Sequence, residues 1–159
     1  MKYFVTGATG FVGNKMARLL REKNHEVVAV VRNPDKAADL KSPGVTLVKG
    51  DVTEKESMRA AMKGCDGVFH IAGWYKIGVR DKTPGVKINI DGTRNVLELM
   101  QELGIRKGVY TSTLAVNSDT HGKLMDETYH FTGKHLSEYD RTKAAAHHVA
   151  DDFIKKGLP

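Results

Sequence analysis

The chain has 159 residues, 40% hydrophobic and 28% charged, which suits one domain with a buried core. Its formal charge is +6, but the basic residues are spread over every segment without interleaved aromatics, so we expect no nucleic-acid partner. No apolar run reaches the roughly 20 residues of a membrane span, and no signal-peptide pattern opens the chain. We therefore expect no membrane partner. Because Cys65 is the only cysteine, no intrachain disulfide can form, and we expect a cytoplasmic protein.

The first element is a short aromatic and β-branched stretch at residues 2–5, which predicts a buried parallel strand. A glycine-rich turn at residues 6–13 follows it and leads into a helix. Apolar residues recur at helical spacing there and predict the buried face: Val12, Met16, Leu19 and Leu20.

The turn has the glycine pattern that a dinucleotide pyrophosphate requires. Gly7 allows a sharp turn, Gly10 allows the backbone to approach the phosphates, and Gly13 allows the helix to pack closely on the strand. The free N–H groups and the positive end of the helix then face the anion. The spacing is one residue longer than G-x-G-x-x-G, and a purely structural glycine turn would also fit this stretch alone.

The chain then alternates between apolar strands and amphipathic helices. Further strands are predicted at residues 27–31, 45–48, 66–71 and 108–112, with a helix start at 32–34, a loop at 74–84 and another at 117–136. Two capping boxes are predicted. Thr53 with Glu56 begins a helix that runs to about Met62, and Ser137 with Asp140 begins the last helix.

This alternation predicts a single α/β domain over residues 1–159, a Rossmann-type doubly wound parallel sheet with helices on both faces. Right-handed crossovers give the strand order 3-2-1-4-5. Ligands of such sheets bind beyond the carboxyl ends of the strands. That rule selects the turns at residues 7–13, 32–36, 51–52, 71–75 and 111–114.

Six motifs occur in order: Thr-Gly-Ala-Thr-Gly-Phe-Val-Gly at 6–13, Gly-Asp-Val at 50–52, His-Ile-Ala-Gly at 70–73, Asn-Ile-Asp-Gly-Thr at 89–93, Thr-Ser-Thr at 111–113 and Tyr-x-x-x-Lys at 139–143. Together they resemble the extended short-chain dehydrogenase/reductase superfamily, in particular its NAD-dependent epimerase/dehydratase and dihydroflavonol-reductase-like group. The resemblance covers nearly the whole chain. Members of that group continue into a smaller substrate lobe, so we expect this chain to be an N-terminal portion without it.

Tyr139 and Lys143 lie four residues apart and share one face of a helix. A phenol has a pKa of about 10, and a neighbouring ammonium lowers it, so Tyr139 would exchange a proton with the substrate. By resemblance, Thr113 holds the reacting oxygen, with Ser112 as the alternative, and Lys143 also holds the nicotinamide ribose. Taken alone, the tyrosine–lysine pair would be a surface feature of an amphipathic helix.

The end of the second strand indicates which dinucleotide binds. NAD sites usually carry an acid there, whereas this chain has Arg32 and nearby Lys36, which favours NADP(H) and leaves NAD possible. Arg32 as a solvated loop charge is the alternative. The resemblance assigns adenine contacts to Asp51 and Val52. It places the other cofactor contacts at Gly7, Thr9, Gly10, Phe11, Val12, Ala72, Gly73 and Lys143.

The histidines have no metal-site spacing. His147 and His148 point to different faces of a helix, and His70, at a strand end, is expected to be a packing residue. We therefore predict no metal.

The sequence favours an NADP(H)-dependent oxidoreductase that acts on a small carbonyl or alcohol substrate. An NAD-retaining sugar-nucleotide epimerase or dehydratase is the alternative enzyme, and a dinucleotide sensor or an interaction module is the non-catalytic one. By analogy we expect a homodimer through helices near residues 86–103 and 138–156. A chain without the substrate lobe would leave its fifth strand at an open edge, bind a dinucleotide and turn over little.

Overall fold

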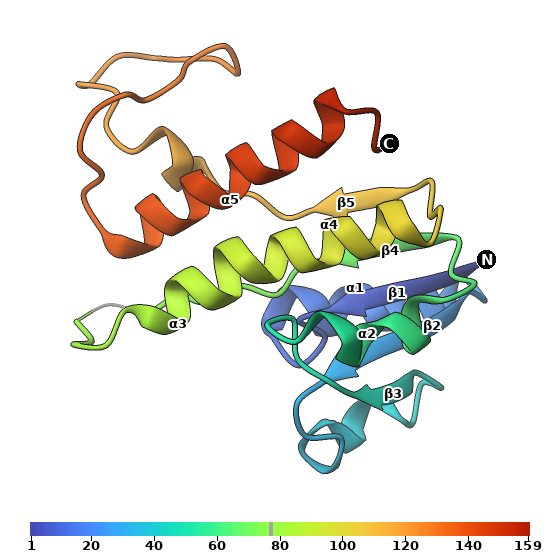
Figure 1. Cartoon of the computed structure of the whole chain (residues 1–159). Helices are drawn as coiled ribbons and strands as arrows, with labels where there is room; N and C mark the ends of the chain where they lie inside the picture. Colours follow the sequence, from blue (N-terminus) through green and yellow to red (C-terminus); the bar gives the residue numbers. More distant parts are fainter. Residues whose placement is uncertain (77) are drawn as a thin grey trace.

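The computed structural model describes residues 1–76 and 78–159; Ile77, within the predicted loop at 74–84, lies outside the described residues. Five parallel strands form one sheet in the order β3-β2-β1-β4-β5, which confirms the predicted topology (Figure 1). The strands are β1 (Lys2–Thr6), β2 (Glu26–Val31), β3 (Thr46–Lys49), β4 (Gly67–His70) and β5 (Gly108–Tyr110).

Helices cover both faces of the sheet (Figure 1). In chain order they are α1 (Phe11–Glu22), the 3-10 helix η1 (Asp35–Leu40), α2 (Lys55–Met62), α3 (Thr83–Gly85), the π-helical turn η2 (Val86–Asp91), α4 (Gly92–Glu102), the 3-10 helix η3 (Leu114–Asn117) and α5 (Glu138–Lys155). Within the described ranges, no helix is both long and apolar enough to cross a membrane.

The alternation of side chains along β1 divides the core in two. Phe4 and Val5 are both fully buried and point to opposite faces. Phe4 packs into the cluster that α2, α4 and α5 cover, whereas Val5 packs into the cluster beneath α1 and η1. Burial on both faces explains why the inner strand β2 is a continuous apolar run rather than an alternating one.

The contact between α1 and β1 is unusually close because Gly13 has no side chain. A Cβ atom added at Gly13 would lie 2.1 Å from the carbonyl oxygen of Gly7. Gly7 itself has φ +74°, a left-handed conformation that favours glycine. The predicted buried face of α1 is partly wrong. Leu20 is buried as predicted, but Val12 and Leu19 are exposed, and the small residues Gly13 and Ala17 take the close contact with the sheet.

The capping box at Ser137 is confirmed. The Asp140 amide donates to Ser137 Oγ at 3.1 Å, and the Ser137 amide donates to Asp140 Oδ2 at 3.2 Å. The box predicted at Thr53 is wrong. Both the amide and the hydroxyl of Thr53 donate to Asp51 Oδ1, at 2.9 and 3.0 Å, so this side chain closes a turn and α2 begins at Lys55.

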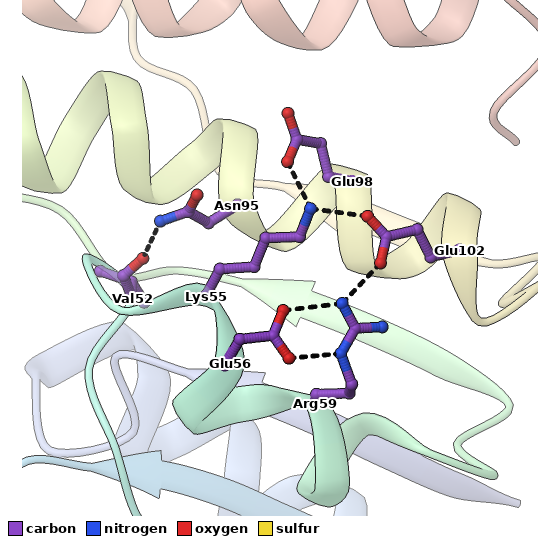
Figure 2. Close-up of polar contacts among 7 residues, drawn as sticks. All are labelled: Val52, Lys55, Glu56, Arg59, Asn95, Glu98 and Glu102. Carbon is purple, nitrogen blue, oxygen red and sulfur yellow. Dashed lines mark hydrogen bonds and ion pairs between the residues drawn. The ribbon is translucent and has the colours of Figure 1, made fainter.

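An ion-pair network joins α2 to α4 on the surface (Figure 2). Lys55 Nζ lies 2.6 Å from carboxylate oxygens of both Glu98 and Glu102, and Arg59 bridges Glu102 to Glu56. The two cationic partners, Lys55 first, hold the pKa of the Glu102 carboxyl below its usual range. Single exposed pairs contribute little, but this network fixes the relative position of the two helices.

We expect Gly13→Ala to lower the free energy of unfolding by at least about 3 kcal/mol, because the added methyl group meets backbone that cannot move aside cheaply. Gly73→Ala is the matched control: its Cβ would lie 3.6 Å from Asn89 Oδ1, an ordinary contact, so we expect a loss below about 1 kcal/mol. Urea unfolding of both variants measures the difference. Equal stability of the two would contradict the close packing of α1 on β1.

Candidate functional site

A cleft of about 650 Å³ lies at the carboxyl ends of the strands, beside the start of α1. It is lined by ten of the predicted cofactor residues: Gly7, Thr9, Gly10, Phe11, Val12, Arg32, Asp51, Val52, Ala72 and Gly73. Tyr139 also lines it, so the start of α5 closes the cleft opposite α1. Lys36, Lys143 and Thr113, also predicted, are not among the lining residues.

The start of α1 offers unpaired donors to this cleft. Gly10 is its N-cap, and among the described residues no side chain caps the helix and no acid lies in its first turn. Phe11 is 95% exposed and Val12 52% exposed, so this first turn is open to solvent. The first N–H groups of a helix need partners and carry its positive end. This donor set fits the pyrophosphate of a dinucleotide.

The opposite end of the cleft is built from the segments after β2 and β3. Arg32 is exposed directly beyond β2. Asp51 is fixed by its turn contacts with Thr53, and the carbonyl oxygen of Val52 accepts a hydrogen bond from Asn95 Nδ2 at 2.9 Å (Figure 2). The α2–α4 network therefore also supports this wall, because α4 carries Asn95.

Asn89 supports the third wall from inside the π-helical turn η2. Its buried side chain accepts from the Trp74 amide at 2.7 Å and donates to the Trp74 carbonyl at 3.1 Å. It also donates to the hydroxyl of Thr142 in α5, at 2.9 Å. One amide thus joins the segment after β4 to α5, next to Gly73 and the cleft.

Lys143 is buried and directed at the end of β5. Its Nζ donates to the Tyr110 hydroxyl at 3.0 Å and to the Thr111 carbonyl at 2.8 Å. Burial lowers the pKa of Lys143 to about 8. Tyr139, one turn earlier, instead meets the ring of Tyr75 edge-on, with ring centroids 4.7 Å apart. Lys143 thus forms its hydrogen bonds with Tyr110 and Thr111, at the end of β5, and the predicted proton relay stays a prediction.

Thr113 faces a different space. It lines a second cavity of about 660 Å³, and its hydroxyl accepts from the Ala115 amide at 3.3 Å to cap η3. Ser112 lines the same cavity and bonds to His147 Nδ1 at 2.9 Å, and His147 Nε2 lies 3.6 Å from Asp151. The structure therefore brings Tyr139 to the first cavity and both candidate hydroxyls to the second.

Sequence reasoning missed two polar contacts of α5. His147 lies four residues after Lys143 and bonds to Ser112, next to the Thr111 that Lys143 binds, a contact that the search for metal-ligand spacing does not predict. Tyr139, Lys143 and His147 are spaced four residues apart, and this spacing indicates that the three side chains share one face of the helix. Tyr110 was missed because nothing in a strand sequence shows which hydroxyl meets a lysine from another element.

The remaining histidines and acids form no metal centre: the described residues contain no cluster of three or more His, Cys, Asp or Glu side chains that could hold an ion. His70 is the packing residue that its strand-end position predicted. It is 2% exposed and lies between the hydroxyls of Thr6 and Thr93. Cys65 is buried and free, and burial raises the pKa of its thiol.

A family model described as "NAD(P)H-binding" matches residues 7–157. The chain belongs to this family. A 2-alkyl-3-oxoalkanoate reductase of Shewanella oneidensis is 36% identical over 147 residues, 90% of this chain and 36% of that protein. The chain spans between a third and a half of the length of the first curated relatives it matches.

Solved structures place the chain within the extended short-chain dehydrogenases and epimerases. A UDP-galactose 4-epimerase superposes with a TM-score of 0.84 and 27% identity, covering 98% of this chain and 52% of that one. MoeE5 in complex with UDP-glucose and NAD gives a TM-score of 0.83 and 26% identity, covering 99% and 50%. The likeness extends over the whole of the sheet and its helices and confirms the resemblance drawn from the six motifs.

The buried ammonium of Lys143 predicts a specific pH dependence. Its pKa is about 8 in the folded chain against 10.5 when unperturbed, so the unfolded state binds more protons between these values. Stability then rises with pH across this window, by up to about 1.4 kcal/mol per pH unit, and the contribution is constant below it. We expect the difference in unfolding free energy between wild type and Lys143→Met to change between pH 8 and 10.

Lys155→Met is the control, because Lys155 is an exposed lysine on the same helix. The difference in unfolding free energy between Lys155→Met and wild type should stay constant between pH 8 and 10. Urea unfolding at half-unit pH steps measures both. A level difference for Lys143→Met would show that its ammonium is solvated.

Proposed function

We propose that this chain is the cofactor-binding part of an NADP(H)-dependent oxidoreductase of the extended short-chain type. One observation carries the proposal: the uncapped start of α1 and exposed Arg32 line the same cleft. A helix N-terminus suits the pyrophosphate, and an arginine beyond the second strand suits a 2′-phosphate. Lys36, exposed beyond the same strand, would add positive charge there.

The binding roles follow from position in the cleft. The turn at Gly7, Thr9 and Gly10, with Phe11 and Val12, would hold the pyrophosphate; Asp51 and Val52 would hold the adenine; Ala72 and Gly73 would line the path to the nicotinamide. The bound nicotinamide supplies or accepts a hydride. The chain's own residues must then orient the substrate and move one proton.

Tyr139 is the proposed proton carrier because it is the ionisable side chain of α5 that lines the cleft. Lys143 supplies the nearby positive charge that favours a phenolate. Thr113, or Ser112 beside it, would hold the reacting oxygen, which requires its hydroxyl to turn from the second cavity toward Tyr139. The proposed substrate is a small carbonyl or alcohol compound. We further propose that the protein is cytoplasmic and forms a homodimer through α4 and α5.

A sugar-nucleotide epimerase or dehydratase that retains NAD is the second candidate. Two solved relatives favour it, since one is a UDP-galactose 4-epimerase and the other is described in complex with UDP-glucose and NAD. Such an enzyme needs no 2′-phosphate partner, so Arg32 separates the two candidates.

We expect NADPH to bind more tightly than NADH, and Arg32→Ala to weaken NADPH binding about tenfold while leaving NADH binding unchanged. The reason is that Arg32 would lose a charge-assisted contact that only NADPH can make. Isothermal titration calorimetry of both nucleotides against both proteins measures this. Arg106→Ala is the matched control, since this exposed arginine lies before β5 and does not line the cleft.

Preference for NADH that Arg32→Ala does not change would contradict the NADP(H) assignment and favour the epimerase or dehydratase. Binding of neither nucleotide would contradict both enzymes and leave an interaction module. Tight binding without turnover by a full-length relative carrying this domain would favour a dinucleotide sensor.

A further inference from the structure

A series of buried and partly buried polar contacts lies beneath the cleft, between β1 and α5. It begins at Thr6, whose hydroxyl oxygen accepts from the amides of Ile71 and Ala72, each at 3.1 Å. Both lone pairs of that oxygen are then occupied. Its hydrogen must therefore go to the next partner, His70 Nδ1, at 2.7 Å. Ile71 and Ala72 line the cleft, so the series starts at the floor of the cofactor site.

The direction of that first bond determines the state of His70. A ring nitrogen that accepts a hydrogen bond from Thr6 carries no hydrogen itself, so the imidazole is neutral and its Nε2 bears the hydrogen. Nε2 lies 3.0 Å from the Thr93 hydroxyl and donates to it. Burial, and then the charge of Lys143, lower the pKa of His70 to about 3, in agreement with a neutral ring.

Tyr110 lies on the other side of Thr93, whose hydroxyl meets His70. Burial raises the pKa of Tyr110, and the side chain of Thr93 partly offsets that rise. The rings of His70 and Tyr110 are stacked, with centroids 5.8 Å apart. Lys143 Nζ, which can only donate, meets the same phenol oxygen at 3.0 Å.

We propose that Tyr110 is a positioning residue for Lys143. Its hydroxyl, on a ring stacked against His70, holds the ammonium against the end of β5, together with the Thr111 carbonyl. These two acceptors use two of the three N–H donors of Lys143. The third N–H donor of Lys143 is available to a hydroxyl group of the ligand. The inference rests on the proposed function, since it concerns how this chain would hold the cofactor.

Packing alone does not account for the hydroxyl. A phenylalanine would fill the same space, and burial makes a polar group unfavourable unless it is hydrogen-bonded. The hydroxyl of Tyr110 is useful here because the buried ammonium needs acceptors, and among the described residues only Tyr110 and Thr111 are hydrogen-bonded to it. The ammonium also lies 4.6 Å from the centre of the Tyr110 ring.

The test is a double-mutant cycle on NADPH affinity, measured by calorimetry for wild type, Tyr110→Phe, Lys143→Met and the double variant. We expect Tyr110→Phe to weaken binding about five- to tenfold in the wild-type background and less than about twofold when Lys143 is already methionine. Equal losses in both backgrounds would overturn the proposal, because Tyr110 would then act without Lys143. So would unchanged affinity in Tyr110→Phe.

A second measurement does not depend on the cofactor. We expect the pKa of the Lys143 ammonium, followed by NMR, to fall further in Tyr110→Phe, because an acceptor that favours the charged form is lost. An unchanged pKa would overturn the proposal even in a chain that binds NADPH. If wild type binds neither nucleotide, the proposed function fails and this titration still decides the role of Tyr110.

Thr93→Val and Thr93→Ser provide variants that leave the phenol in place. Serine keeps the hydroxyl and should preserve the pKa of Lys143, whereas valine removes the link between His70 and Tyr110 and should shift it. Equal values in the two variants would show that Thr93 does not orient the phenol.

Discussion

The site depends on the contact between α1 and the turn that follows β1. Because Gly13 lies directly against the carbonyl of Gly7, the helix starts at the edge of the sheet with its first N–H groups open to the cleft. A side chain at either glycine would push the helix outward and move those donors away from a ligand. The cleft therefore exists because two elements approach more closely than residues with a Cβ allow.

The other side of the cleft is held by a different kind of contact. α5 docks through polar side chains. Buried Lys143 and partly exposed His147 bind successive residues after β5, and buried Thr142 meets Asn89 of η2. Buried polar contacts are directional, so they set both the position and the rotation of the helix. Tyr139 reaches the cleft because the rest of the helix is fixed in this way.

The sequence was sufficient for the features that follow from local chemistry. The glycine turn, the apolar strands and their order predicted the edge of the sheet where the cleft lies, and ten residues proposed for the cofactor line that cleft. Prediction from the sequence was wrong where a residue could make either of two local contacts. Thr53 could cap a helix or close a turn with Asp51, and the turn prevailed; Val12 and Leu19 had helical spacing, but the small residues faced the sheet. Contacts such as that of Tyr110 with Lys143 join distant segments, and no spacing shows them.

The short segment 111–113 lies between the two cavities, and its residues face one or the other. Thr111 lines the cleft and accepts from Lys143, whereas Ser112 and Thr113 line the second cavity, where His147 holds Ser112. Because α5 binds this segment at two points, its docking sets where Tyr139, Ser112 and Thr113 lie relative to one another. Their arrangement thus depends on the contact between α5 and the end of β5 rather than on the surface loops.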